Sequence, residues 1–206
     1  MIYFAPPHAS AVPHMVTGDL GWIDTPDQCN QGGRPAGVVW IADNGCFGTK
    51  TFDEDRWFSW LQKHPDIEHC MFATAPDVVG DHAETLIRSA PWLPKIRALG
   101  YPAAFVAQDG AEVDTMPWGD FDALFIGGTD DFKLSQTALD IAADARRRGM
   151  WVHVGRVNSR QRYLRFSSVA DSADGTFILF GPRIRLPEVL GWVREYRNRI
   201  PLWEGA

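Results

Sequence analysis

Short apolar runs recur along this chain, and most of them end in an acid, an amide or a glycine. The run at 38–42 is uninterrupted and rich in β-branched and aromatic residues, which is typical of a strand buried on both faces. It leads into Asp43-Asn44-Gly45, which also fits a simple turn with a capping acid. The same pattern predicts eight strands, at Ile2–Ala5, 38–42, 69–74, Ala103–Ala107, Ala123–Ile126, Trp151–Val154, 167–174 and 176–180.

Apolar residues at helical spacing lie between these strands. Trp57, Trp60 and Leu61 form the i, i+3, i+4 stripe of a helix that packs on a sheet, behind an acidic first turn. Further helices are predicted from Asp81, over 133–148 with Leu134 on its inward face, over 160–166, and from Pro187 as a first helical residue.

The alternation of elements predicts the fold. Residues 6–37 hold five Pro, five Gly and no helical periodicity, which predicts one long loop after the first strand. Elsewhere strands alternate with helices or helix-sized gaps, so we expect a single α/β domain over residues 1–206, a compact (β/α)8 barrel. An open doubly wound sheet is the alternative, although no G-x-G-x-x-G motif follows the first strand.

Composition narrows the class of protein. No apolar run reaches membrane-spanning length, and the first residues lack the pattern of a signal peptide, so we expect a cytoplasmic protein with no membrane partner. Cys29, Cys46 and Cys70 are widely separated and form no C-x-x-C pair. Neither a zinc site nor a disulfide framework is therefore expected.

Charge is divided unevenly along the chain. Residues 1–144 hold 8 Lys or Arg and 21 Asp or Glu, whereas residues 145–206 hold 12 Arg and 5 Asp or Glu. The arginines fit either solvated helix faces or a basic flank that follows nucleic-acid phosphates, which match the Arg fork. The second interpretation assigns phosphate contacts to Arg156, Arg160, Arg162 and Arg183, in the loops after the last three predicted strands.

Polar residues and glycines collect where the predicted strands end. In a barrel the carboxyl ends of all strands surround one pocket, so residues far apart in sequence would meet there. Each of them also fits a turn or a helix cap. Facing carboxylates can attack a sugar carbon and transfer protons, while an amide and glycine N–H groups can read the edge of a purine. These residues are Asp43, Asp77, Gln108, Gly127, Gly128, Gly155, Asp171 and Asp174.

Six short motifs follow one another in order between residues 38 and 180. Residues 43–48 are similar to the motif D-S-G-G-F/Y-Q, and Asp77 is similar to a conserved Asp after the third strand. Residues 105–110 are similar to G-x-V-Q-G-G, and residues 125–128 are similar to A-I-G-G. Val154-Gly155 is similar to part of M-G-V-G, and residues 171–174 are similar to D-x-x-D. Together they resemble the tRNA-guanine transglycosylases and their phage and bacterial relatives that insert 7-deazaguanines into DNA.

The resemblance implies an enzyme, a pentosyltransferase that exchanges guanine for a 7-deazaguanine base through a covalent Asp-glycosyl intermediate. Asp174 would be the nucleophile at C1′, with Asp171 as the nearest competitor for that role, and Asp43 would transfer protons. The implied substrate-binding residues are Phe47, which would stack on the base, together with Asp77, Gln108, Gly127, Gly128, Val154 and Gly155.

The sequence departs from the tRNA enzymes in ways that refine this expectation. Their zinc ligands, a C-x-C-x-x-C cluster and a later His, have no counterpart, because no Cys follows Cys70. We therefore expect no zinc cofactor and no tRNA-contacting subdomain. The chain resembles the short DNA-modifying branch, which favours DNA over tRNA, a preQ0-type base, other modification proteins as partners, and the host cytoplasm if the protein is phage-encoded. Asn44, Cys46 and Gly48 replace family residues, which alters that loop.

Two other functions fit the same residues. A barrel N-glycoside hydrolase would use the same two carboxylates with water in place of the incoming base. A non-catalytic barrel would bind nucleobases or nucleic acid without forming a covalent adduct. The base-edge residues Asp77 and Gln108 favour base exchange over hydrolysis.

Overall fold

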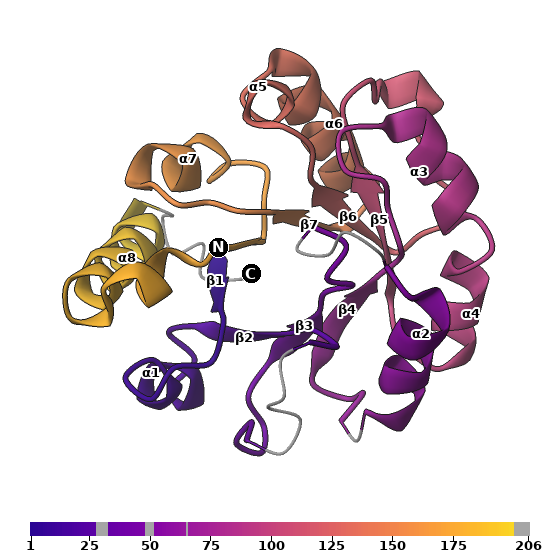
Figure 1. Cartoon of the computed structure of the whole chain (residues 1–206). Coiled ribbons are helices and arrows are strands. Elements are labelled where there is room, and N and C mark those ends of the chain that lie inside the picture. Colours follow the sequence, from indigo (N-terminus) through magenta and orange to yellow (C-terminus); the bar gives the residue numbers. More distant parts are fainter. Residues whose placement is uncertain (28–32, 48–51, 65, 200–206) are drawn as a thin grey trace, which may run out of the picture.

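Eight parallel strands close into a barrel in sequence order, and helices surround it (Figure 1). This computed structural model describes residues 1–27, 33–47, 52–64 and 66–199. The last strand pairs with the first, which places Asp174 opposite Phe4. The predicted compact (β/α)8 barrel is confirmed. Its strands are β1 Ile2–Ala5, β2 Gly21–Asp24, β3 Trp40–Ala42, β4 Cys70–Thr74, β5 Ala103–Ala107, β6 Ala123–Ile126, β7 Trp151–Val154 and β8 Ser172–Asp174.

Helices and short 3-10 turns connect the strands. The helices α2 Glu54–Lys63 and α3 His82–Ser89 begin after Asp53 and Asp81, whose carboxylates accept backbone N–H groups of the first turn. The predicted apolar stripe of α2 is buried. The remaining elements are α1 Val12–Val16, α4 Leu93–Ala98, η1 Val113–Thr115, α5 Asp130–Lys133, α6 Gln136–Arg147, α7 Arg160–Arg165, η2 Phe177–Phe180 and α8 Pro182–Arg199.

The number of predicted strands is right only because one strand was missed and another was predicted where none exists. Residues 6–37 are not one long loop, because α1 and β2 lie within them. The strand β2 contains Gly21 and Asp24 beside its two apolar residues, so it lacks the apolar run by which the other strands are recognised. The glycine is required there, since a Cβ atom on Gly21 would lie 2.3 Å from the ring of Phe4.

The predicted strand at 176–180 is wrong, since η2 occupies this segment. The strand β8 already pairs with β1, so the closed barrel offers no free edge to another strand after it. The Phe180 side chain is accordingly exposed although the segment is apolar. An apolar pattern alone does not distinguish such a turn from a strand.

The helices after β6 and β8 also differ from the prediction. The helix predicted at 133–148 does not start at residue 133, where α5 ends. A new helix, α6, begins after Ser135, whose hydroxyl accepts the Ala138 N–H. Leu134 lies in the break and is exposed, whereas it was expected to point inward. The last helix begins at Pro182, so Pro187 lies inside it rather than at its start.

Apolar side chains form two layers, because successive residues of a strand point alternately into the barrel and outward. The outer layer packs between strands and helices and includes Val154. His153 on β7 lies among inner aromatic rings, with centroid distances of 4.6 Å to Phe125 and 5.2 Å to Phe72. The inner cluster consists of Phe4, Ile23, Ile41, Phe72, Ala104, Val106, Ala123 and Phe125.

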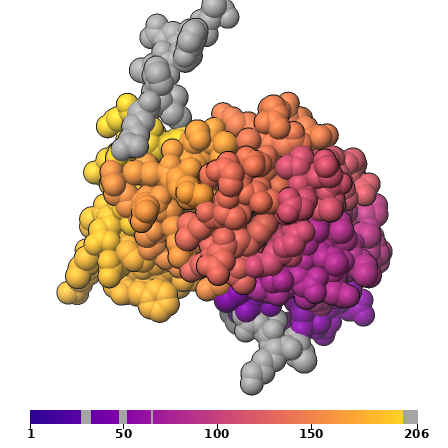
Figure 2. All heavy atoms as spheres, turned by 90° about the horizontal axis from the view of Figure 1, so that it is seen from above, coloured from indigo at the N-terminus to yellow at the C-terminus, as the bar shows by residue number. Residues whose placement is uncertain are grey.

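Neighbouring parts of the chain cover neighbouring parts of the surface. In the space-filling view the colours follow the sequence across the molecule, from α8 in yellow at one end to the magenta and purple segments at the other (Figure 2). This local connectivity is expected where every strand pairs with the next along the chain. Within the described ranges, no helix has the length and apolar character needed to cross a bilayer.

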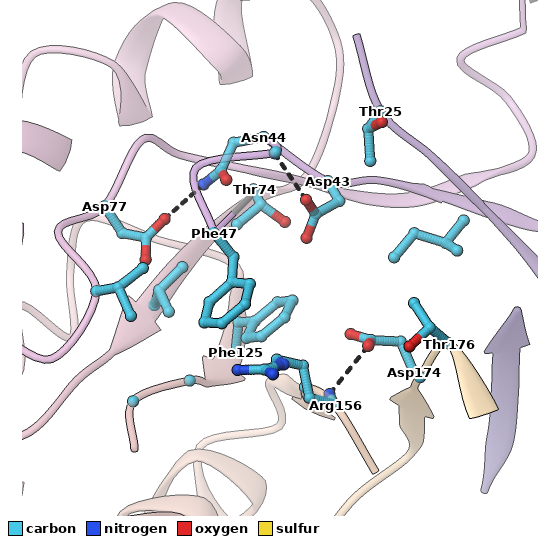
Figure 3. Close-up of a pocket in the computed structure, with 18 of the residues that line it drawn as sticks. Thr25, Asp43, Asn44, Phe47, Thr74, Asp77, Phe125, Arg156, Asp174 and Thr176 are labelled. Atoms are coloured by element: carbon cyan, nitrogen blue, oxygen red, sulfur yellow. Dashed lines mark hydrogen bonds between the residues drawn. The ribbon is translucent and has the colours of Figure 1, made fainter. Parts of the chain in front are cut away.

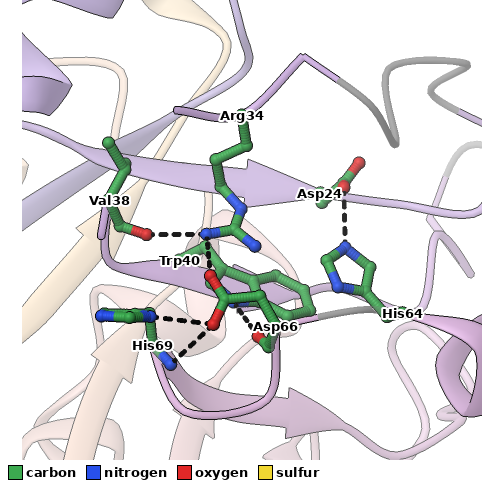
Figure 4. A network of polar contacts seen from close by, with 7 residues as sticks. All are labelled: Asp24, Arg34, Val38, Trp40, His64, Asp66 and His69. Carbon is green, nitrogen blue, oxygen red and sulfur yellow. Dashed lines mark hydrogen bonds and ion pairs between the residues drawn. The ribbon is translucent and has the colours of Figure 1, made fainter. Parts of the chain in front are cut away.

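A polar network in the outer layer ties β2, β3 and the turn before β4 together (Figure 4). The Arg34 side chain is only 7% exposed and donates to Asp66 Oδ2 at 2.8 Å. Trp40 donates its indole N–H to the Asp66 carbonyl at 2.7 Å, and the His64 ring stacks on Trp40 at 3.9 Å between centroids. His64 in turn contacts Asp24 at 3.3 Å. The charge of Asp66 therefore compensates a nearly buried guanidinium.

We expect Asp66→Asn to destabilise the protein most near neutral pH. Burial raises the pKa of Asp66, but hydrogen bonds from His69 and Arg34 and the charge of Arg34 outweigh it and lower the pKa from 3.8 to about 2. A carboxylate whose pKa falls on folding adds stability that is present above its unfolded pKa and is lost as the pH falls through the folded pKa. The lost free energy of unfolding at pH 7 should be about 2 kcal/mol.

Urea unfolding followed by circular dichroism between pH 2 and 7 measures this loss. Asp120→Asn, at an exposed position, is the matched control and should change the free energy of unfolding by less than about 0.5 kcal/mol. A destabilisation by Asp66→Asn that stays the same from pH 7 to pH 2 would contradict the assignment to the ionised carboxylate.

Candidate functional site

A cavity of about 430 Å³ opens at the carboxyl ends of the strands. All eight strand ends or the loops after them contribute to its lining, as expected for the single pocket of a closed barrel. The structure brings together most of the residues that were predicted from strand ends. Those that line the cavity are Asp43, Phe47, Asp77, Gln108, Gly127, Gly128, Gly155, Arg156 and Asp174.

Asp174 ends β8 and is held by two donors. Its Oδ1 accepts the backbone N–H of Arg156 at 2.9 Å, and its Oδ2 lies 2.9 Å from His153 Nε2. His153 Nδ1 lies 2.8 Å from Ser172 Oγ, which also accepts the indole N–H of Trp151 at 2.8 Å. An indole can only donate, so the Ser172 hydroxyl is free to donate to Nδ1, which assigns the proton of a neutral ring to Nε2. His153 thus donates to Asp174.

The backbone at Arg156 is strained in a way that serves this arrangement. Among the residues described, Arg156 is the one non-glycine with a positive φ, 58°. Its preceding residue must be small, since a Cβ atom on Gly155 would lie 2.5 Å from the Phe125 ring. The Arg156 N–H points at Asp174, while its guanidinium lies 3.6 Å from the centroid of the Phe47 ring (Figure 3).

Asp43 follows β3 and points into the same space as Asp174 (Figure 3). Its Oδ1 accepts the N–H of Gly45 at 2.7 Å. Burial, followed by the charges of Asp174 and Asp77, raises the pKa of Asp43 to about 7. A carboxyl group with this pKa can give or take a proton near neutral pH.

Asp77 is held by two side-chain amides. Asn44 Nδ2 donates to its Oδ1 at 2.8 Å, and Gln108 Nε2 donates to its Oδ2 through a short hydrogen bond. The amides are oriented in turn, because Asn44 also donates to the Ala75 carbonyl at 2.7 Å and Gln108 accepts the Gly80 N–H at 2.9 Å. Burial raises the pKa of Asp77, against these hydrogen bonds. The result is a preorganised acceptor at the cavity wall.

The glycines after β6 allow a close approach of the backbone. A Cβ atom on Gly127 would lie 2.6 Å from Val106, and one on Gly128 would lie 2.6 Å from the Asp109 carboxylate. Gly128 also has a φ of 76°. Their backbone therefore lines the cavity without side chains that would fill it.

Five predicted site residues lie elsewhere. Asp171 precedes β8 and accepts the Val152 N–H at the amino ends of the strands, so the expectation that it faces the pocket is wrong. Val154 is buried in the outer layer, because it points away from the barrel interior. The remaining three are arginines on the outer helices: Arg160 pairs with Glu195, Arg162 pairs with Asp130, and Arg183 is exposed in the first turn of α8.

Several residues that line the cavity were not predicted, among them Thr74 and Lys133, and neither was His153, which lies behind Asp174. Thr74 ends β4 and its buried hydroxyl has no hydrogen-bond partner among the described residues. Lys133 ends α5, with a side chain that is 6% exposed, and His153 is the interior partner of Asp174. A threonine in a strand, a lysine in a helix and a histidine in an apolar run belong to no motif, so no pattern signals their position.

The cysteines do not gather at one place. Cys46 is partly buried beside Asp77, Cys70 is buried on β4, and Cys29 lies outside the described residues. In the described part of the chain, no three His, Cys, Asp or Glu side chains are grouped so that they could hold a metal ion.

Comparison with known proteins concerns the fold alone. No family model and no curated protein matches the sequence. Tryptophan synthase from M. tuberculosis in its aminoacrylate-bound form matches at a TM-score of 0.52 and 12% identity, over 95% of this chain and 91% of that chain. The structure of 3-hexulose-6-phosphate synthase from Salmonella typhimurium matches at a TM-score of 0.52 and 14% identity, over 95% of this chain and 99% of that chain. The open, BRD0059-bound form of tryptophan synthase from M. tuberculosis matches at a TM-score of 0.51 and 12% identity. The match covers 92% of this chain and 65% of that chain.

We expect Asp43→Asn to stabilise the folded protein by an amount that grows as the pH rises from about 4 to about 7. Because folding raises the pKa of Asp43 from 3.8 to about 7, its ionisation opposes folding, and wild type loses stability as the pH rises through this range. An amide cannot ionise and can still accept the Gly45 N–H. The gain above pH 7 should reach up to about 4 kcal/mol and should vanish below pH 4.

Urea unfolding of both proteins between pH 4 and 8 provides the measurement. A carboxyl ¹³C titration of wild type gives the pKa independently and should report a value near 7 for Asp43. A stability difference that is equal at pH 5 and pH 8 would show that burial and the neighbouring acids do not control this group.

Proposed function

We propose that this protein is a transglycosylase that exchanges guanine in nucleic acid for a 7-deazaguanine base through a covalent intermediate on Asp174. One observation carries the proposal: Asp174 and Asp43 line one cavity together with a set of oriented polar groups, Asp77, Asn44 and Gln108. The six motifs that resemble the transglycosylases contain all five residues by position, and four of them, all but Asn44, are of the same type as in the family.

The two carboxylates suit the two halves of a base exchange. In the first half an Asp174 oxygen bonds to C1′ while the C1′–N9 bond breaks, and guanine leaves with the electron pair and a proton from Asp43. In the second half Asp43 takes the N9 proton of the incoming base, N9 attacks C1′, and the ester bond to Asp174 breaks. Two inversions retain the configuration at C1′. A pKa of about 7 lets Asp43 serve in both directions.

The hydrogen bonds to Asp174 support its role as the nucleophile. Donors to both oxygens, from the Arg156 backbone and from His153, fix the direction of the carboxylate. Asp171, the competitor for this role, lies at the amino ends of the strands, where its carboxylate accepts the Val152 N–H. It therefore has no access to a sugar in the cavity.

The other side of the cavity suits the edge and face of a guanine. Asp77 can accept from N1–H and N2–H, and the backbone at Gly127 and Gly128 can approach a ring edge closely. Phe47 is 58% exposed; Arg156 stacks on one face of its ring, and the exposed part is where a base could stack. A cavity of about 430 Å³ is in the usual range for a small ligand. The base would have to leave its stack in the nucleic acid to enter.

The substrate and the incoming base rest on the resemblance to the short DNA-modifying branch. We propose DNA rather than tRNA as the nucleic acid and a preQ0-type base as the incoming group. A hydrolase on the same carboxylates is the second candidate, and its product differs: hydrolysis leaves an abasic site, whereas exchange leaves a new base.

We expect Asp174→Asn to abolish the covalent intermediate while the fold is kept. The amide retains the shape of the carboxylate but is a poor nucleophile, so exchange should slow by at least about 1000-fold. The measurement uses a guanine-containing oligodeoxynucleotide or a tRNA with preQ0, and detects the protein–nucleic acid adduct on a denaturing gel and the product base by mass spectrometry.

Asp171→Asn is the matched control, since it removes the other acid of D-x-x-D at the far end of the barrel, and it should still form the adduct. Loss of the adduct in Asp171→Asn but not in Asp174→Asn would refute the assignment. An abasic product with wild type, and no new base, would favour the hydrolase.

A further inference from the structure

Lys133 is a nearly buried cation that the proposed base exchange does not use. Its side chain is 6% exposed and lines the cavity from the end of α5. Among the described residues, the one acid within salt-bridge distance of its ammonium is Asp130, whose Oδ1 lies 3.6 Å from Nζ, and the charge of Asp174 also acts on it from farther away. Asp130 is itself bound by both terminal nitrogens of Arg162, at 3.0 and 2.7 Å. Lys133 therefore shares its counterion, Asp130, with Arg162, which binds that carboxylate at shorter distances.

Arg156 adds a second cation to this part of the cavity. In the described part of the chain, no carboxylate lies within salt-bridge distance of its guanidinium, which stacks on Phe47 instead. Lys133 and Arg156 line the same cavity. Burial, followed by the charge of Arg156, lowers the pKa of Lys133, while the charges of Asp130 and Asp174 act in the opposite direction. Two like charges with little compensation in a cavity wall are costly unless a ligand brings the opposite charge.

We propose that Lys133 and Arg156 form a binding site for a phosphate group of the substrate. The proposal rests on the transglycosylase function and deepens it, because it makes a nucleotide, rather than a free nucleoside, the unit that the cavity recognises. A compact ammonium and a guanidinium fork both suit phosphate oxygens. Base, sugar and phosphate then have separate partners: Asp77 with its amides, Asp174, and the Lys133–Arg156 pair.

The surroundings of the pair leave room for a phosphate and limit where it can bind. Gly155, Gly175 and Thr176 line the cavity in the loops after β7 and β8, which are frequent phosphate positions in barrels of this fold. The carboxylate of Asp174, and that of Asp43 when it is ionised, repel an anion from their part of the cavity. A phosphate is thereby confined to one side, and this would orient C1′ of the attached sugar.

Two sources can supply this phosphate: the phosphodiester of a nucleic acid or the phosphomonoester of a free nucleotide. Isothermal titration calorimetry on the full chain carrying Asp174→Asn, which prevents turnover, compares guanosine, guanosine 5′-monophosphate and a short single-stranded oligodeoxynucleotide with one guanine. We expect the phosphorylated ligands to bind about 10- to 100-fold more tightly than guanosine. A tighter oligonucleotide indicates the phosphodiester, and a tighter monophosphate indicates the free nucleotide.

Lys133→Gln should remove most of this preference and change the affinity for guanosine less than about twofold. Lys133→Arg keeps the charge and should keep the preference, which separates loss of the cation from loss of the fold. Lys63→Gln, at an exposed position at the end of α2, is the matched control and should have no effect. An unchanged preference for phosphorylated ligands in a folded Lys133→Gln variant overturns the proposal.

The outcome can be separated from that of the proposed function. If Lys133→Gln loses the preference but wild type forms no adduct with any guanine nucleic acid, the phosphate site stands and base exchange fails. If wild type forms the adduct and Lys133→Gln keeps the preference, base exchange stands and the phosphate site fails.

Discussion

Pairing of β8 with β1 closes the barrel, and the composition of the cavity depends on this contact. It places Asp174 opposite Phe4 and brings the last strand to the side of the first. Without closure, the carboxylates at the ends of β3 and β8 would lie at opposite parts of an open sheet. With closure, Asp43 and Asp174 face the same space, and their proximity contributes to the raised pKa of Asp43.

Four acids line the cavity, and one of them, Asp27, is exposed to solvent. The other three must each be accommodated in a different way, because neighbouring charges inside a cavity repel one another. Asp174 receives an N–H from the strained backbone of Arg156 and another from His153. Asp77 receives two amides. Asp43 has one backbone donor and takes up a proton near neutral pH instead. This division matches a nucleophile, a fixed acceptor and a proton carrier.

Seven of the eight predicted strands are present, and the failures have physical causes. Continuous apolar runs such as Ala103–Ala107 are buried on both faces, and that environment demands their composition. The strand β2 was not predicted, because its first residue must be a glycine beside Phe4 and its last residue, Asp24, is a buried acid in contact with His64. Residues 176–180 are apolar but follow the strand that closes the barrel, so no edge was left for them.

The sequence by itself determined the type of element, the alternation that leads to a barrel, and the strand ends at which Asp43, Asp77, Gln108 and Asp174 lie. These features depend on local composition and on the strand period. Only the tertiary structure decided which of two acids three residues apart enters the cavity, because the direction of a strand and its pairing assign Asp174 to one end of the barrel and Asp171 to the other. It also decided that Lys133 is buried, since that depends on contacts between segments distant in the chain.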